Sequence, residues 1–155
     1  MGVNTVASSA ALANAVYGIR VDRSAATLPA TTSTEYFHVY NGRVIMTMLV
    51  GEVTTVIQAQ ACNTSWEHNP TTGTTNAICA VLDVTGKEAG TLFSITGTAG
   101  DAMIAGSSGG VKGQLAPVVL AVGGLELKTA ATNTGATKWS LFYIPLDDGA
   151  YVAAV

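Results

Sequence analysis

Charged side chains are scarce in this sequence. Only 11% of its 155 residues are Asp, Glu, Lys or Arg, whereas about 25% is usual for soluble domains. Seven cations face ten anions, for a net charge of −3, and the Lys and Arg residues are not clustered. Binding to phosphate backbones or to anionic lipid surfaces requires such clusters. We therefore expect neither nucleic acid nor a membrane as a partner.

Histidine and cysteine, the usual metal ligands and nucleophile partners, occur only twice each. His38 and His68 lie in or beside predicted strands, without further ligands at metal-binding spacing, and zinc needs three or four convergent ligands. The glycine-rich stretch 106–113 lacks the Gly-Lys-Ser/Thr ending of a phosphate-binding loop. The sequence therefore predicts no metal, no cofactor and no enzymatic activity.

Cys62 and Cys79 leave two alternatives open. A hairpin that turns at residues 69–73 would bring them near each other, and a cross-strand disulfide has demanding geometry. In a chain made in a reducing cytoplasm, two buried free thiols are favoured.

Long hydrophobic runs are also missing. No stretch approaches the 18 or more apolar residues of a membrane span. Residues 1–4 carry no basic group and no apolar core follows them, which is unlike a secretory signal. We therefore expect the chain to be made in the cytoplasm.

Strand-forming residues, in contrast, are abundant, and their longest run is at residues 36–61. This run is rich in β-branched and aromatic side chains, which suit a pleated, half-buried surface. Asn41-Gly42 is a strong short-hairpin signal because both residues tolerate positive φ. Gly51-Glu52 indicates a second turn or a bulge. The run therefore predicts two or three strands.

The remainder of the chain continues this pattern, with about eight short strands and turn signals roughly every ten residues. Such spacing is typical of an all-β sandwich or barrel. We predict one domain at residues 35–155 and prefer a jelly roll, because that fold takes about eight strands.

Residues 1–34 differ from the rest in being rich in small residues. A short helix is suggested at residues 8–16 by Ala and Leu, but we interpret the whole segment as an extended N-terminal arm. It is expected to lie on a neighbouring subunit or shell, because it carries few charges to desolvate. The apolar residues proposed to form this interface are Val3, Val6, Leu12, Val16, Tyr17, Ile19, Val21 and Leu28.

Three stretches resemble small structural proteins of tailed bacteriophages. These are Gly42-Arg43-Val44, the run at residues 49–58 (LVGEVTTVIQ), and the run at residues 138–150 (KWSLFYIPLDDGA). The resemblance spans about residues 36–150 and implies a virion component, without selecting head, fibre or tail; some proteins of this group decorate or cement the head.

These observations predict a capsid decoration, or cement, protein that binds the head shell as an oligomer and stabilises it. Low charge supports this because interface cores are depleted in charge. The expected partners are further copies of the chain, as a homotrimer, and the major capsid protein, with the capsid surface of the virion as its location. The alternative is a head-fibre or tail module that binds host-surface glycan or receptor. That alternative predicts a platform of exposed aromatics drawn from Trp66, Trp139, Tyr36, Tyr40, Tyr143 and Tyr151.

Overall fold

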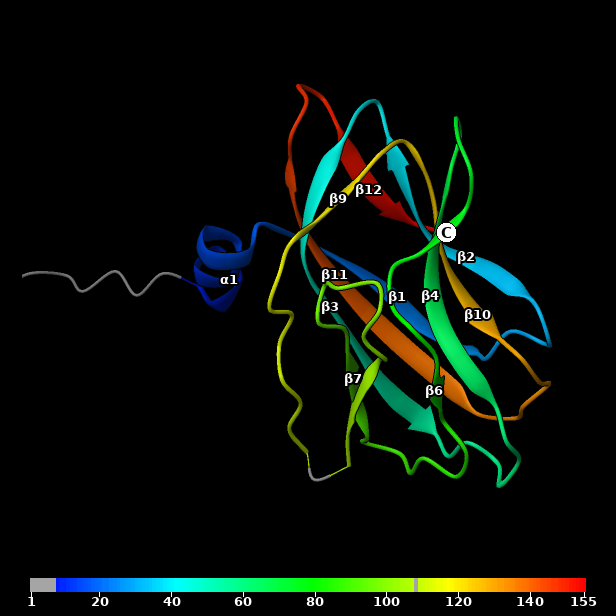
Figure 1. The fold of residues 1–155 in the computed structure, drawn as a ribbon. Helices are drawn as coiled ribbons and strands as arrows, with labels where there is room; N and C mark the ends of the chain where they lie inside the picture. Colours follow the sequence, from blue (N-terminus) through cyan, green and yellow to red (C-terminus); the bar gives the residue numbers. More distant parts are fainter. Residues whose placement is uncertain (1–7, 108) are drawn as a thin grey trace, which may run out of the picture.

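The computed structural model describes residues 8–107 and 109–155. Within them the chain forms one short helix and twelve strands, and the strands make two facing sheets (Figure 1). The elements are α1 (Ser9–Tyr17), β1 (Ile19–Thr27), β2 (Ser33–Tyr40), β3 (Val44–Thr55), β4 (Asn63–Pro70), β5 (Asn76–Ala77), β6 (Leu82–Asp83), β7 (Leu92–Ser94), β8 (Ile104–Gly106), β9 (Val118–Leu120), β10 (Gly123–Thr129), β11 (Ala136–Pro145) and β12 (Tyr151–Ala154).

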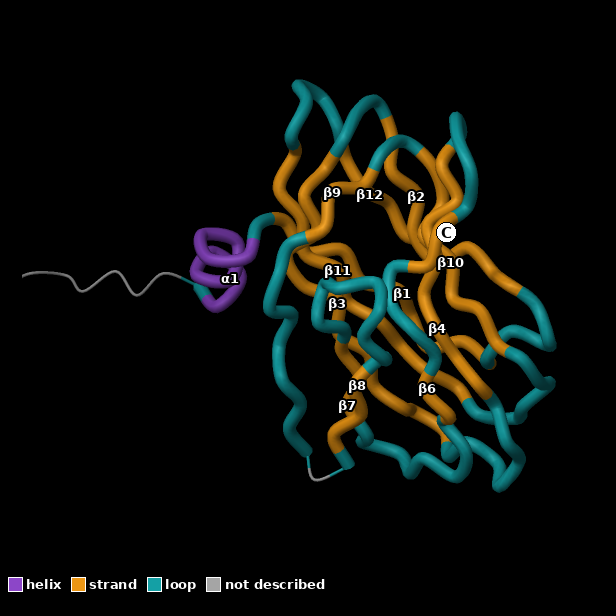
Figure 2. The backbone as a smooth tube through the Cα atoms, viewed as in Figure 1, coloured by secondary structure: helices purple, strands orange, loops and turns teal. Residues whose placement is uncertain are grey.

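Each sheet has six antiparallel strands. Sheet A runs in the order β1-β11-β3-β7-β8, and β9 also pairs with β3. Sheet B runs in the order β12-β2-β10-β4-β5, and β6 also pairs with β4. The tube in Figure 2 shows how strands dominate the backbone. The predicted all-β sandwich is confirmed.

The core lies between the two sheets and is built on aromatic side chains. Trp66 from sheet B and Trp139 from sheet A meet edge to face, with ring centroids 4.8 Å apart. Trp139 also stacks on Phe93, and Tyr36 packs edge-on against Trp66. All four side chains are buried. Burial of rings of this size contributes much of the stability of a small domain.

The turn predicted at Asn41-Gly42 is confirmed. Asn41 has φ 62° and Gly42 has φ 152°, backbone angles that Asn and Gly tolerate best. The strands on either side do not form a hairpin, however. Strand β2 belongs to sheet B and β3 to sheet A, so this turn carries the chain from one sheet to the other.

The second predicted break, at Gly51-Glu52, is wrong. Strand β3 continues without interruption through both residues. Gly51 is opposite Trp139 in the neighbouring strand β11. A Cβ at Gly51 would lie 2.7 Å from three atoms of the Trp139 ring, so the glycine makes room for the indole.

The prediction of an extended arm over residues 1–34 is also wrong for its second half. Residues 19–27 form strand β1, which pairs with β11 from Ile19↔Tyr143 to Thr27↔Ala136. The segment thus folds into the domain's own sheet A as its edge strand. Composition misled the prediction, since small residues such as Ala25 and Ala26 are weak strand formers and tertiary pairing overrides that preference.

Both cysteines are free and buried, as favoured from the sequence. The backbone N–H of Trp66 donates to the Sγ of Cys79 at 3.3 Å, and burial raises the pKa of this thiol. Cys62 directly precedes strand β4. Its carbonyl accepts a hydrogen bond from the backbone N–H of Val84 at 3.1 Å.

Candidate interaction surfaces

Helix α1 is bounded by well-defined caps. The Ser8 side chain accepts a hydrogen bond from the Ala11 N–H at 3.2 Å, as an N-cap serine should. The C-cap of the helix is Gly18, which has φ 91° and donates its N–H to the Asn14 carbonyl at 3.1 Å. A Cβ at Gly18 would collide with the carbonyl of Tyr143, so glycine is needed here to end the helix against strand β11.

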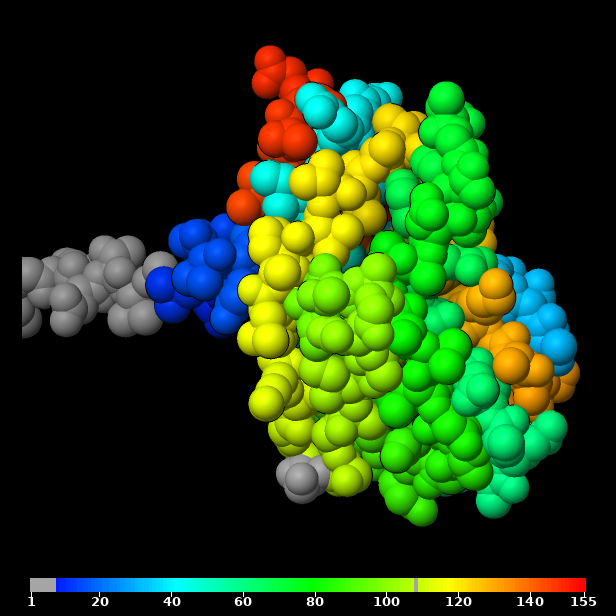
Figure 3. Space-filling view, in the orientation of Figure 1, coloured from blue at the N-terminus to red at the C-terminus, as the bar shows by residue number. Residues whose placement is uncertain are grey.

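The helix projects from the domain and buries none of its own residues. Figures 1 and 3 show it beside the sandwich, attached at its C-terminal end. Residues 8–19 include no charged side chain. Isolated helices shorter than about 12–15 residues are marginal in water. A nine-residue helix that is both exposed and uncharged therefore depends on its caps and on its attachment to the domain.

The attachment of α1 depends on its last residue. The Tyr17 ring packs edge-on against Phe142 of β11, with centroids 5.8 Å apart. The hydroxyl of Thr47 in β3 donates to the Tyr17 carbonyl. Phe142 points away from the sandwich core, yet only 7% of it is exposed. Tyr17 is among the side chains that cover it. The end of α1 thus has a fixed position on the outer face of sheet A.

Apolar side chains continue from α1 across that outer face. Ile144 of β11 is in register with Ile45 of β3, and Ile45 is in register with Val119 of β9. Exposed fractions are 43% for Ile144 and 57% for Val119. Together with exposed residues of α1 they form what we call the α1 strip. The α1 strip consists of Leu12, Val16, Tyr17, Ile45, Val119 and Ile144.

The structure places the predicted interface residues in three different settings. Leu12, Val16, Tyr17 and Ile19 are exposed, at 55%, 68%, 42% and 44% respectively. Val21 packs against the core and Leu28 is buried in it. The interface prediction is wrong for Val21 and Leu28. Strand β1 and the residue that follows it turn these two side chains into the domain. Val3 and Val6 lie outside the described residues.

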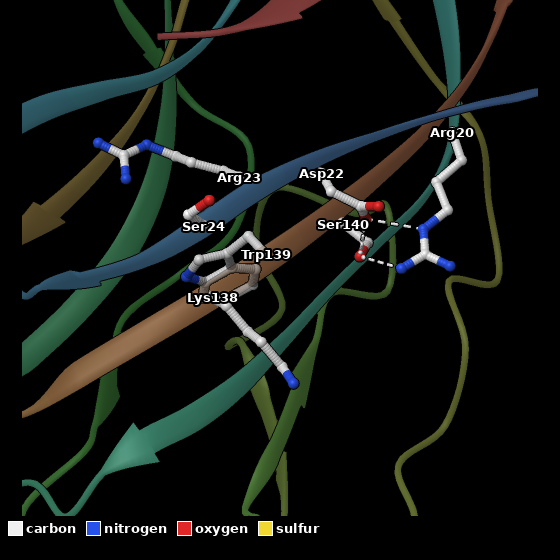
Figure 4. A pocket seen from close by; sticks show the side chains of 7 residues that line it. All are labelled: Arg20, Asp22, Arg23, Ser24, Lys138, Trp139 and Ser140. Atoms are coloured by element: carbon white, nitrogen blue, oxygen red, sulfur yellow. Dashed lines mark hydrogen bonds and ion pairs between the residues drawn. The ribbon is translucent and has the colours of Figure 1, made fainter.

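A shallow depression of about 260 Å³ lies on sheet A between β1 and β11 (Figure 4). Three of its four charged side chains are in ion pairs. Arg20 binds Asp22 at 2.7 Å, and Asp22 also accepts from Ser140 at 2.6 Å. Lys138 pairs with Glu52 at 2.8 Å. Arg23 points away from the other side chains drawn in Figure 4 and lies over the Tyr36 ring at 3.9 Å. The three charged side chains that remain beside this depression are therefore already paired with one another or with Glu52.

The two histidines lie on different faces of sheet B. His38 points outward and bonds the Glu35 carboxylate. His68 is opposite the core residue Leu125, and its Nδ1 lies 3.0 Å from the Gly124 carbonyl. Burial lowers the pKa of His68. Across residues 8–107 and 109–155, no three His, Cys, Asp or Glu side chains are grouped to hold a metal ion.

The outer face of sheet B carries a polar surface, which the sequence did not indicate. Gly123-Gly124, a pair typical of turns, begins strand β10 instead and pairs with both β2 and β4. As a result Glu126 of β10 is in register with Glu35 of β2 and with Glu67 of β4. No local pattern places these three glutamates together, because they are far apart in sequence.

The aromatic platform expected for a glycan-binding module is mostly absorbed by the core. Trp66, Trp139, Tyr36 and Tyr143 are all buried, at 0–3% exposed. Tyr40 and Tyr151 remain at the surface. They are Cα partners on β2 and β12, and their rings stack with centroids 4.9 Å apart.

Among the described residues, no helix has the length and apolar character that crossing a membrane demands. No protein family, no curated protein and no solved structure matches the chain.

Proposed function

We propose that this chain is a bacteriophage virion structural protein, specifically a capsid decoration (cement) protein that binds the head shell as an oligomer. The observation that carries the proposal is helix α1. A helix that buries none of its residues in its own domain, carries no charge, and continues into the exposed α1 strip is built as a contact surface.

The α1 strip suits association for a physical reason. Its six side chains have apolar surface to bury and no charges to desolvate, so docking gains hydrophobic free energy at little electrostatic cost. Exposed apolar patches of this kind on a monomer mark interaction sites. The proposed assembly is a homotrimer. In it, α1 of one copy packs on the sheet A face of the next copy or on the major capsid protein.

The order of the strands supports the finer proposal of a jelly roll. Long-range pairs nest in the manner of a folded ribbon, with β1 against β11, β2 against β10, β3 against β7 and β4 against β5. Successive pairs alternate between sheets A and B. Jelly rolls are double-sheet folds that occur in viral capsid domains among others, which agrees with a virion role by analogy of fold.

Two measurements test the proposal. Light scattering of the full chain in solution should give the mass of three copies. Quantitative mass spectrometry of purified particles of the phage that encodes the chain should find it at a copy number comparable with that of the capsid subunits. A chain absent from the particles, or present in only a few copies, would exclude the cement role.

The alternative of a head-fibre or tail module is weakened by the burial of both tryptophans, because neither can stack on a sugar. The remaining surface pair, Tyr40 and Tyr151, still provides one specific site for such a ligand.

A further inference from the structure

Three aromatic rings form a ladder on the outer face of sheet B. His38 lies 4.4 Å from Tyr40, centroid to centroid, and Tyr40 lies 4.9 Å from Tyr151 at an interplanar angle of 17°. Tyr40 is the middle ring, and Tyr151 is the 43% exposed end of the ladder. A ring held by stacking on a second ring has lost its rotamer freedom before any ligand arrives, which reduces the entropy cost of binding.

Polar groups continue from the ladder across the same face. The row that contains His38 passes through Gly124 to Asn69, and the next row contains Glu35, Glu126 and Glu67. Gly124 leaves room for the Glu35 side chain, since a Cβ there would lie 2.8 Å from a Glu35 carboxylate oxygen. The ladder and these rows span three inter-strand gaps of about 4.8 Å, or roughly 14 Å in all, which fits a di- or trisaccharide.

The carboxylates are held in place by hydrogen bonds within this face. Glu35 binds His38, and Asn69 Nδ2 donates to Glu126 at 3.0 Å. Glu67 binds Ser33 and Lys128, the latter at 3.1 Å. Like charges directly opposite on neighbouring strands destabilise a sheet. A row of three glutamates fixed in register therefore costs stability, and a binding role would account for it.

We propose that this face, from Tyr151 across to Asn69, binds a neutral glycan. A terminal pyranose packs its apolar face on the solvent-facing edges of the stacked Tyr40 and Tyr151 rings, and the hydroxyls of the following units donate to Glu35 and Glu126. Ionised carboxylates only accept hydrogen bonds, so they match hydroxyl donors. With three glutamates and one lysine, the face repels sulfated, phosphorylated and carboxylated sugars.

This binding activity goes beyond the proposed shell-binding role and uses the opposite sheet. The α1 strip covers sheet A, whereas the glycan face belongs to sheet B. The two surfaces can therefore be tested separately with two tyrosines of equal exposure. Tyr17 on α1 is 42% exposed and Tyr151 is 43% exposed.

The experiment is a titration of the full ¹⁵N-labelled chain, monitored by two-dimensional NMR. Each neutral oligosaccharide is added separately, up to about 10 mM, a range that detects weak binding. The neutral panel is cello-, xylo-, manno-, malto- and chitohexaose. Sialyllactose and a heparin tetrasaccharide serve as anionic probes. We expect at least one neutral sugar to shift amides of β2, β10 and β12, and the anionic sugars to shift none of them. Tyr151→Ala should weaken binding by about tenfold, the equivalent of one aromatic stacking contact, and Tyr17→Ala should leave it unchanged.

Glu126→Gln is a second variant, at a half-exposed position, that keeps the shape of the side chain and should weaken the same binding without affecting the fold. The proposal is overturned if no sugar of the neutral panel shifts these amides, if Glu126→Gln and a folded Tyr151→Ala both bind as the parent does, or if the anionic sugars bind equally well. Loss of oligomers in Tyr17→Ala with intact sugar binding would leave this inference standing on its own.

Discussion

Two truncations separate the α1 strip from the domain that carries it. The first chain begins at Tyr17, after an initiator methionine, and so loses α1 except its anchoring residue. The second begins at residue 31 and loses β1 as well. The described residues removed by the first truncation are exposed or, in the case of Ala13, half-buried. Removal of such surface residues changes the free energy of unfolding by less than about 1 kcal/mol.

The second truncation removes structure that the core needs. Leu28 is 5% exposed, and loss of a buried leucine costs about 1.5–3 kcal/mol. Val21 packs on the core as well and adds roughly 1 kcal/mol for its half-buried side chain. The whole register of β1 with β11 is lost with them. These costs consume a large part of a total stability of about 5–15 kcal/mol, so the chain from residue 31 should lack a fixed fold.

Near-ultraviolet circular dichroism reports the packing of Trp66 and Trp139, and urea titration gives the free energy of unfolding. The chain from Tyr17 should keep the parent spectrum and midpoint but run as a monomer in light scattering. The chain from residue 31 should lose the near-ultraviolet signal. The reasoning fails if the chain from Tyr17 stays oligomeric, or if the chain from residue 31 keeps native packing.

Three further predictions follow from single contacts. Gly51→Ala pushes a Cβ into the buried Trp139 ring and should lower the free energy of unfolding by about 1–3 kcal/mol. The control Gly100→Ala, whose Cβ would meet nothing within 4 Å, should change it little. Equal urea midpoints for the two variants would refute this. The side chain and backbone N–H of Arg43 hydrogen-bond Asp147 and lower its pKa from 3.8 to about 2; the stabilisation is thus present above pH 3.8 and lost as the pH falls through about 2. Arg43→Ala removes the side chain but keeps the backbone N–H, so NMR titration should show the pKa of Asp147 raised towards 3.8 without reaching it, and an unchanged pKa would refute the role of the guanidinium. The Cys79 thiol, buried and with a raised pKa, should resist iodoacetamide at pH 8 until the chain is unfolded; rapid labelling of the native protein would contradict its burial.

Local patterns in the sequence were enough to predict the fold class. Alternation in segments such as 125–129 identifies strands because successive side chains point to opposite faces of a sheet. Asn41-Gly42 identified a turn because few other residue pairs accept its backbone angles. The scarcity of charge indicated a surface with apolar contacts, which the exposed side chains of α1 and sheet A agree with.

Pairing between distant strands decided the rest. Residues 19–27 have no strong strand signal, and they form a strand because β11 offers them a free edge. Gly51 and Gly123-Gly124 look like breaks in the sequence, yet they belong to strands β3 and β10. At position 51 a glycine is required by the Trp139 ring, which approaches from another strand. The row of Glu35, Glu126 and Glu67 and the stack of Tyr40 on Tyr151 likewise join residues tens of positions apart. A sequence records which side chains a strand presents to each face, but only the register between strands sets which of them become neighbours.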